Sequence, residues 1–135
     1  MRIVPFFALP VLFCAVASAA DTARTPPGPV VTTLLTQKLD SVPGKEALML
    51  TVEYPPGGAD PVHRHNADAL VYVLEGSIVM GVAGAKPVTL TAGQTFHEGP
   101  DDVHTVGRNA SDSKPAKFVV FLLKDAGKPA LIPVD

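Results

Sequence analysis

The chain is poor in the residues that form disulfides, basic surfaces and aromatic clusters. It has one cysteine, Cys14, no tryptophan, and only 6% aromatic residues. Its 11 basic and 13 acidic side chains give a formal net charge of −2, and the basic residues form no cluster. That balance argues against nucleic acids and anionic membranes as partners. A lone cysteine excludes an internal disulfide and a site built from several thiolates.

The first twenty residues have the pattern of an export signal. Arg2 precedes an almost wholly apolar stretch, Ile3 to Val16, and small residues fill positions 17–20. This pattern is typical of a secretory signal peptide, and the apolar stretch is too short for a membrane span. We therefore expect cleavage after Ala20 and a periplasmic or secreted bacterial protein that is not held at the membrane. Lipid attachment at Cys14 is the alternative, which the large preceding side chain disfavours.

Short apolar stretches between glycine and proline turns fill the rest of the chain. Residues 46–54 alternate in polarity, which is typical of a half-buried strand. Further strands are expected at 30–38, 69–74, 77–82, 86–91, 94–98, 103–108 and 117–123. No window has helical periodicity, so the sequence predicts an all-β barrel or sandwich over residues 30–125. A flexible lead-in, 21–29, precedes it and a loose C-terminal tail, 126–135, follows.

Two histidines lie one residue apart before an apolar stretch. In an extended strand, side chains at positions i and i+2 point to the same face. His63 and His65 can therefore bind one metal ion, and His104 offers a third imidazole about forty residues later. A His-x-His pattern alone is weak evidence, because exposed histidines are common. The surrounding glycines give it more weight.

Residues 57–76 and 93–109 resemble the two motifs of the cupin superfamily, as found in small single-domain bacterial cupins. The first motif is matched at Gly57, His63, His65 and Gly76. The second is matched at Gly93, Gly99-Pro100, His104 and Asn109, with the asparagine one residue late. The resemblance implies a cupin-type double-stranded β-helix, or jelly-roll barrel.

The chain departs from the first motif at its glutamate ligand, whose position is occupied by Ala69. The adjacent Asp68 is expected to point to the opposite face. The resemblance then implies a metal site formed by His63, His65 and His104, similar to that of some cupin dioxygenases. One divalent ion is expected there, and imidazole nitrogen suits iron, zinc, manganese, nickel or copper.

Glu98 is the candidate catalytic residue. It precedes His104 by six positions, and related cupins have a glutamate there, close to the metal. It could bind the metal, orient an imidazole or a bound water, or accept a proton, and we favour the last two roles. The neighbouring His97 is expected to face outward. Asn109 is expected to hold backbone groups near a turn.

The resemblance implies a metal-dependent dioxygenase that acts on a small oxygen-chelating molecule, such as a diketone, an enol or a flavonol. The alternative is a non-catalytic module that binds a metal or a small ligand. A metal-free sugar epimerase is a third alternative. It would need a basic pocket for a phosphorylated sugar, and the chain has few inward-facing basic residues. The family also suggests a homodimer, paired through the strand 30–38. The candidates for pocket-lining side chains are Met49, Tyr54, Tyr72, Phe96 and Phe121, of which we expect one or two to line a ligand cavity and the others to belong to the core.

Overall fold

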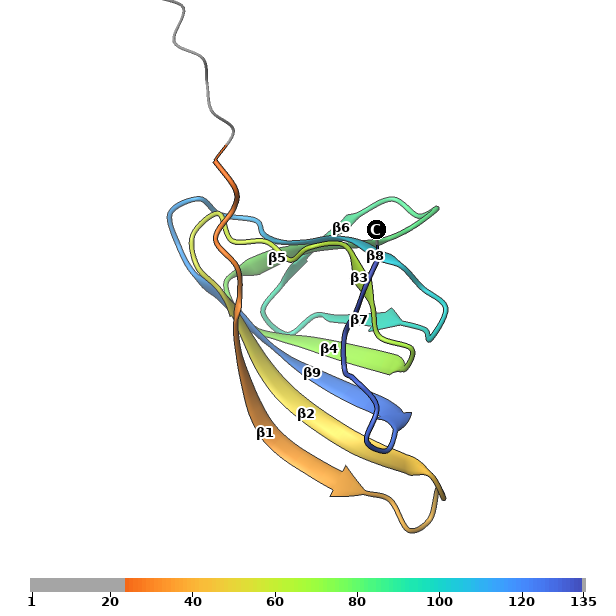
Figure 1. Ribbon diagram of the computed structural model, residues 1–135. Coiled ribbons are helices and arrows are strands. Elements are labelled where there is room, and N and C mark those ends of the chain that lie inside the picture. Colours follow the sequence, from red (N-terminus) through yellow and green to blue (C-terminus); the bar gives the residue numbers. More distant parts are fainter. Residues whose placement is uncertain (1–23, 135) are drawn as a thin grey trace, which may run out of the picture.

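The computed structural model describes residues 24–134, which form two facing antiparallel sheets of five strands each (Figure 1). The order in the first sheet is β1-β2-β9-β4-β7, and the order in the second is β10-β3-β8-β5-β6. The strands are β1 Val30–Lys38, β2 Lys45–Tyr54, β3 His63–Arg64, β4 Asp68–Glu75, β5 Ser77–Val82, β6 Val88–Thr91, β7 Thr95–Glu98, β8 His104–Asn109, β9 Ala116–Asp125 and β10 Ile132–Pro133. The expected export signal lies outside the described residues. Within residues 24–134, no helix is long and apolar enough to cross a membrane.

The alternating residues of the central strands form the core between the two sheets. On β9, every second residue from Ala116 to Leu122 is buried, and the intervening residues are partly exposed. β2 contributes the inward face predicted from its alternation, with Val52 and Tyr54 buried. Full burial of an aliphatic or aromatic side chain contributes about 1.5–3 kcal/mol relative to its exposure. The all-β, jelly-roll prediction is confirmed.

The end of β9 carries a charge into the core. Lys124 is on the inward face with only 3% of its surface exposed, and its ammonium group pairs with the carboxylate of Glu46 at the start of β2. Its Nζ also donates to the backbone oxygen of Asp125, 3.0 Å away. Because the lysine is compensated in this way, β9 continues two residues beyond the apolar stretch that predicted it.

The C-terminal segment is more ordered than a loose tail. Ile132 and Pro133 form β10, which pairs with Arg64 and His63 of β3. The lead-in is fixed as well, since the oxygen of Pro27 accepts a hydrogen bond from the backbone N–H of Ala59. The C-terminal segment therefore pairs with the short histidine strand, and the lead-in is bonded to the segment that precedes this strand. Strand β3 itself is too short for composition to indicate which segment pairs with it.

Asn109 has the structural role expected for it. Its side-chain amide donates to the backbone oxygens of Pro55 and Lys114, at 3.0 and 2.8 Å. Its side-chain oxygen accepts from the N–H of Ser111 at 2.9 Å. These bonds join the loop after β2 to the loop after β8. They fix the start of the segment that leads into β3.

Candidate metal centre

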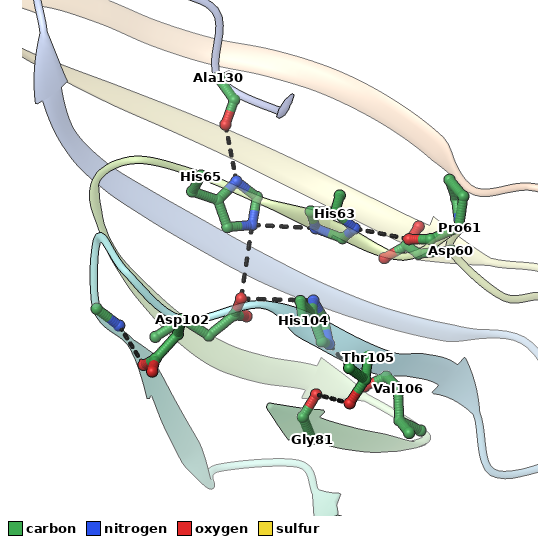
Figure 2. A network of polar contacts seen from close by, with 12 residues as sticks. Asp60, Pro61, His63, His65, Gly81, Asp102, His104, Thr105, Val106 and Ala130 are labelled. Carbon is green, nitrogen blue, oxygen red and sulfur yellow. Dashed lines mark hydrogen bonds and ion pairs between the residues drawn. The ribbon is translucent and has the colours of Figure 1, made fainter. Parts of the chain in front are cut away.

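The three predicted histidines lie together on the inner side of the second sheet (Figure 2). His63 of β3 is the direct cross-strand partner of His104, the first residue of β8. Each offers one nitrogen, and with that of His65 these ligand atoms lie within 4.8 Å of one another. β3 ends at Arg64, so His65 lies just beyond the strand, before the left-handed residue Asn66 (φ 50°). The imidazoles of His63 and His65 do lie together, as their i, i+2 spacing predicts, although the strand is shorter than that reasoning assumed.

A backbone carbonyl fixes each imidazole in one tautomer. A carbonyl oxygen can only accept, so the ring nitrogen facing it carries the proton. The pairs are His63 Nδ1 with Pro61 O at 2.8 Å, His65 Nδ1 with Ala130 O at 2.7 Å, and His104 Nε2 with Val106 O at 2.6 Å. The remaining nitrogen of each ring then has a free lone pair that is turned toward the other rings.

These lone pairs fit a metal ion. His63 Nε2 and His65 Nε2 are 3.2 Å apart, although in these tautomers neither carries a proton. Nitrogens bound to one ion at about 2.0–2.1 Å come to about 3 Å from each other. Within the described residues, His104 Nδ1 is buried and has no hydrogen-bond partner. Burial lowers the pKa of His104 to about 4 and also lowers the pKa of His65, so the neutral, metal-binding forms are favoured.

Glu98 brings a buried carboxyl group to the same point. Its Oε2 is 3.5 Å from His104 Nδ1 and 3.8 Å from His65 Nε2, and it has no hydrogen-bond partner within residues 24–134. Burial raises the pKa of Glu98 to about 7, and the negative charges of Asp102 and Asp60 add to the shift. A carboxyl group with such a pKa can both accept and release a proton near neutrality.

Asp68 and His97 face away from the centre, as expected. Both side chains are more than half exposed, and His97 Nε2 lies 3.0 Å from Asp68 Oδ1. Asp68 is on β4 next to Ala69, which is fully buried. Alternation along the strand thus sends the carboxylate outward, and it cannot reach the three imidazoles.

A cavity of about 250 Å³ opens beside the three imidazoles. Its walls are mainly aliphatic, with Val52, Val71, Met80, Phe118 and Val120 among the lining residues. None of the five candidate side chains lines it, so the prediction that one or two of them would is wrong. Tyr72 points outward and is 48% exposed. The outer face of the first sheet is also rich in apolar residues. Alternation separates two faces but does not say which one is inside when both are apolar.

One polar residue of the cavity, Asp60, is not predicted from the sequence. Asp60 lines the cavity and accepts a hydrogen bond from the hydroxyl of Tyr54, which has no exposed surface. Burial raises the pKa of Asp60, while the hydrogen bond from Tyr54 acts in the opposite direction. In the sequence, Asp60 directly precedes Pro61, and both are turn-forming residues. This pattern indicates a turn rather than a site.

The fold and the histidine cluster define a double-stranded β-helix protein with a candidate mononuclear metal centre. The profile of the family described as "Cupin domain" matches residues 50–122, which is more than half of the chain, and the chain belongs to this family. No curated protein matches the chain.

Solved structures share the fold. An uncharacterized conserved protein with a double-stranded beta-helix domain from Klebsiella pneumoniae is 18% identical, with a TM-score of 0.63 over 82% of this chain and 90% of that one. The DMSP lyase DddQ from Ruegeria pomeroyi is 20% identical, with a TM-score of 0.58, over 65% of this chain and 43% of the lyase. An oxalate oxidase in complex with the substrate analogue glycolate is 25% identical, with a TM-score of 0.61, over 87% of this chain and 60% of the oxidase. The chain thus spans less than two thirds of either enzyme.

Proposed function

We propose that the protein is an exported metal-dependent dioxygenase that acts on a small molecule able to chelate a metal through two oxygen atoms. The observation that carries this proposal is the set of three imidazoles, each fixed on a backbone carbonyl with its free nitrogen turned to a common point. That point borders an apolar cavity large enough for a small organic ligand. Three imidazole ligands leave positions for other molecules, as a catalytic site requires.

His63, His65 and His104 would hold the metal. When bound, a redox-active divalent ion would supply Lewis acidity and electron transfer to the reaction. Glu98 would accept the proton that a chelating substrate loses and hold it in the buried site, since its pKa is raised to about 7. The aliphatic walls would exclude water from the substrate, and the backbone carbonyls would keep the imidazoles oriented.

The size of the cavity favours a small substrate. At about 250 Å³, it lies below the range of roughly 300–1,000 Å³ that is usual for sites of drug-sized ligands. A diketone, an enol or a hydroxy acid therefore suits it better than a flavonol. The structural similarity to an oxalate oxidase in complex with the substrate analogue glycolate also supports a small oxygen-containing substrate.

The first test is the metal content of the purified protein and of a His63→Ala/His104→Ala double variant. We expect close to one equivalent of metal in the wild type and its loss in the variant. Dioxygen uptake is then measured with acetylacetone and with small hydroxy acids, using the metal found and iron(II). No metal in the wild type, even after incubation with several divalent ions, would contradict the proposal.

A non-catalytic module that binds a metal or a small ligand is the second candidate. It is favoured by the absence of the motif's glutamate at Ala69 and by the largely apolar lining of the cavity. Metal-dependent ligand binding without consumption of dioxygen or conversion of the ligand would select this function.

We also propose a homodimer that pairs through β1. This strand is at the edge of the first sheet, and all nine of its residues are exposed, with Val30, Val31 and Leu34 each more than half exposed. An exposed apolar edge can add a strand from a second copy. Light scattering tests this: we expect a dimer for the wild type and a monomer for Leu34→Lys, and a wild-type monomer would contradict it.

A further inference from the structure

Asp60 occupies a fixed place in the wall of the cavity. Its backbone N–H donates to the oxygen of Gly107 on β8 at 2.8 Å, and the preceding Ala59 forms a β-bridge with Arg108. The segment that carries Asp60 is therefore held on the strand that begins with His104. Its side chain lines the same cavity as the three imidazoles and Glu98.

The hydroxyl of Tyr54 holds one oxygen of this carboxylate. Tyr54 is fully buried, and its O–H donates to Asp60 Oδ2. Both groups pack tightly around Gly107: a Cβ at that position would lie 2.9 Å from the Tyr54 hydroxyl, 3.0 Å from Asp60 Oδ2 and 2.8 Å from His104 Cε1. The tyrosine and the aspartate thus adjoin a histidine of the metal centre. The other carboxylate oxygen, Asp60 Oδ1, makes no hydrogen bond within the described residues, so it can accept one from a ligand.

The polar lining of the cavity is sparse and consists of imidazoles and carboxyl groups. Within residues 24–134, no lysine or arginine lines it, and the polar side chains besides the three imidazoles are Asp60 and Glu98. Each imidazole donates a hydrogen bond from one ring nitrogen to a backbone carbonyl, and its other nitrogen faces the metal position. A ligand group that does not bind the metal therefore meets carboxyl oxygens, which accept hydrogen bonds when ionised.

We propose that Asp60, positioned by Tyr54, selects ligands that chelate the metal and keep an O–H or N–H group to donate to it. This inference rests on the metal centre of the proposed function and narrows its substrate class to hydroxy acids, hydroxy ketones and similar molecules. A dicarboxylate has no such proton. In the described part of the chain, the cavity lining includes no lysine or arginine that could offset a second negative charge, so a dianion would also be repelled by ionised Asp60.

Glycolate and oxalate form a matched pair of probes, since both are small oxygen chelators and only glycolate has a hydroxyl. Dissociation constants for the two are measured on the Co²⁺-loaded protein by visible absorption, which also reports whether the metal stays bound. The measured quantity is the ratio of the two constants, oxalate over glycolate. Asp60→Asn replaces the acceptor with an amide that can donate, so we expect this ratio to fall by about 10-fold or more.

Two further variants separate selection from a structural effect. Tyr54→Phe keeps both carboxylates but frees Asp60, and we expect a smaller fall of the ratio in the same direction. Asp68→Asn removes the exposed carboxylate of the outer face, and we expect no change. A ratio unchanged in Asp60→Asn and Tyr54→Phe, with Co²⁺ retained, overturns the role of Asp60 alone. A wild type that binds no metal overturns the proposed function as well.

Discussion

Glu98 is the direct cross-strand partner of Ala69 in the pairing of β7 with β4. Side chains of paired residues lie on the same face of a sheet, about 4.5–5.5 Å apart at Cβ. The first cupin motif has its glutamate at the position of Ala69, so the chain brings a carboxyl group to the same region from the neighbouring strand. The distances of 3.5 and 3.8 Å from Glu98 to His104 and His65 agree with such a replacement.

Moving the carboxylate back to β4 tests this relationship. We expect Glu98→Ala to weaken metal binding by about 10- to 100-fold, whether the carboxylate contacts the metal or a ligand of it. The double variant Ala69→Glu/Glu98→Ala should recover most of the lost affinity, because the two positions face the same space. Competition with a chelating indicator measures both. An affinity of the double variant no better than that of Glu98→Ala would show that the positions are not equivalent.

The C-terminal segment is predicted to contribute to metal affinity. Ala130 accepts the hydrogen bond that fixes the tautomer of His65, and β10 pairs with β3. Deletion of residues 129–135 should therefore weaken metal binding by about 10-fold or more, while circular dichroism remains that of a β-protein. Deletion of Asp135 alone is the control. Unchanged affinity in the longer deletion would mean that the imidazole is oriented without this carbonyl.

Glu98 should make the metal-free protein less stable as pH rises. Its pKa is raised from 4.5 to about 7 in the folded chain, so between these pH values the folded state binds more protons than the unfolded state. The contribution of Glu98 to the free energy of unfolding then falls as pH rises from 4.5 to 7. Urea unfolding with a chelator present should show that Glu98→Gln gains stability relative to the wild type across this window. A difference that does not vary with pH would contradict the prediction.

Gly107→Ala is expected to disturb both stability and the site. The added methyl group would lie within 3.0 Å of the His104 ring, the Tyr54 hydroxyl and the Asp60 carboxylate. Overpacking of this kind costs about 1–3 kcal/mol, so the melting temperature and the metal affinity should both fall. Gly28→Ala is the matched control, because nothing lies within 4 Å of its added Cβ. Wild-type metal binding in Gly107→Ala would show that the three groups can move apart at little cost.

The sequence predicts the strands well because their signals are local. Alternation over residues 46–54 and the glycine turns are read within a few positions, and the first and fifth strands have the predicted bounds. The three histidines follow from motif spacing, and His97 and Asp68 are correctly directed outward by alternation along their strands.

The remaining features depend on register between distant segments. Ala130 fixes His65 through its backbone oxygen. Every residue type has this atom, so the sequence gives no signal for the contact. The burial of Lys124 depends on Glu46, which is 78 positions away. Asp60 belongs to the cavity because its loop is held on β8, and that contact is also nonlocal.

The bond from His65 to Ala130 joins residues 65 positions apart. During synthesis, strands β1 to β9 leave the ribosome before this carbonyl does. The hydrogen bond that fixes the tautomer of His65 therefore forms only after these strands have been made. A chain that stops between β9 and Ala130 would have these strands but not the carbonyl that orients His65, and we expect it to acquire its ion poorly.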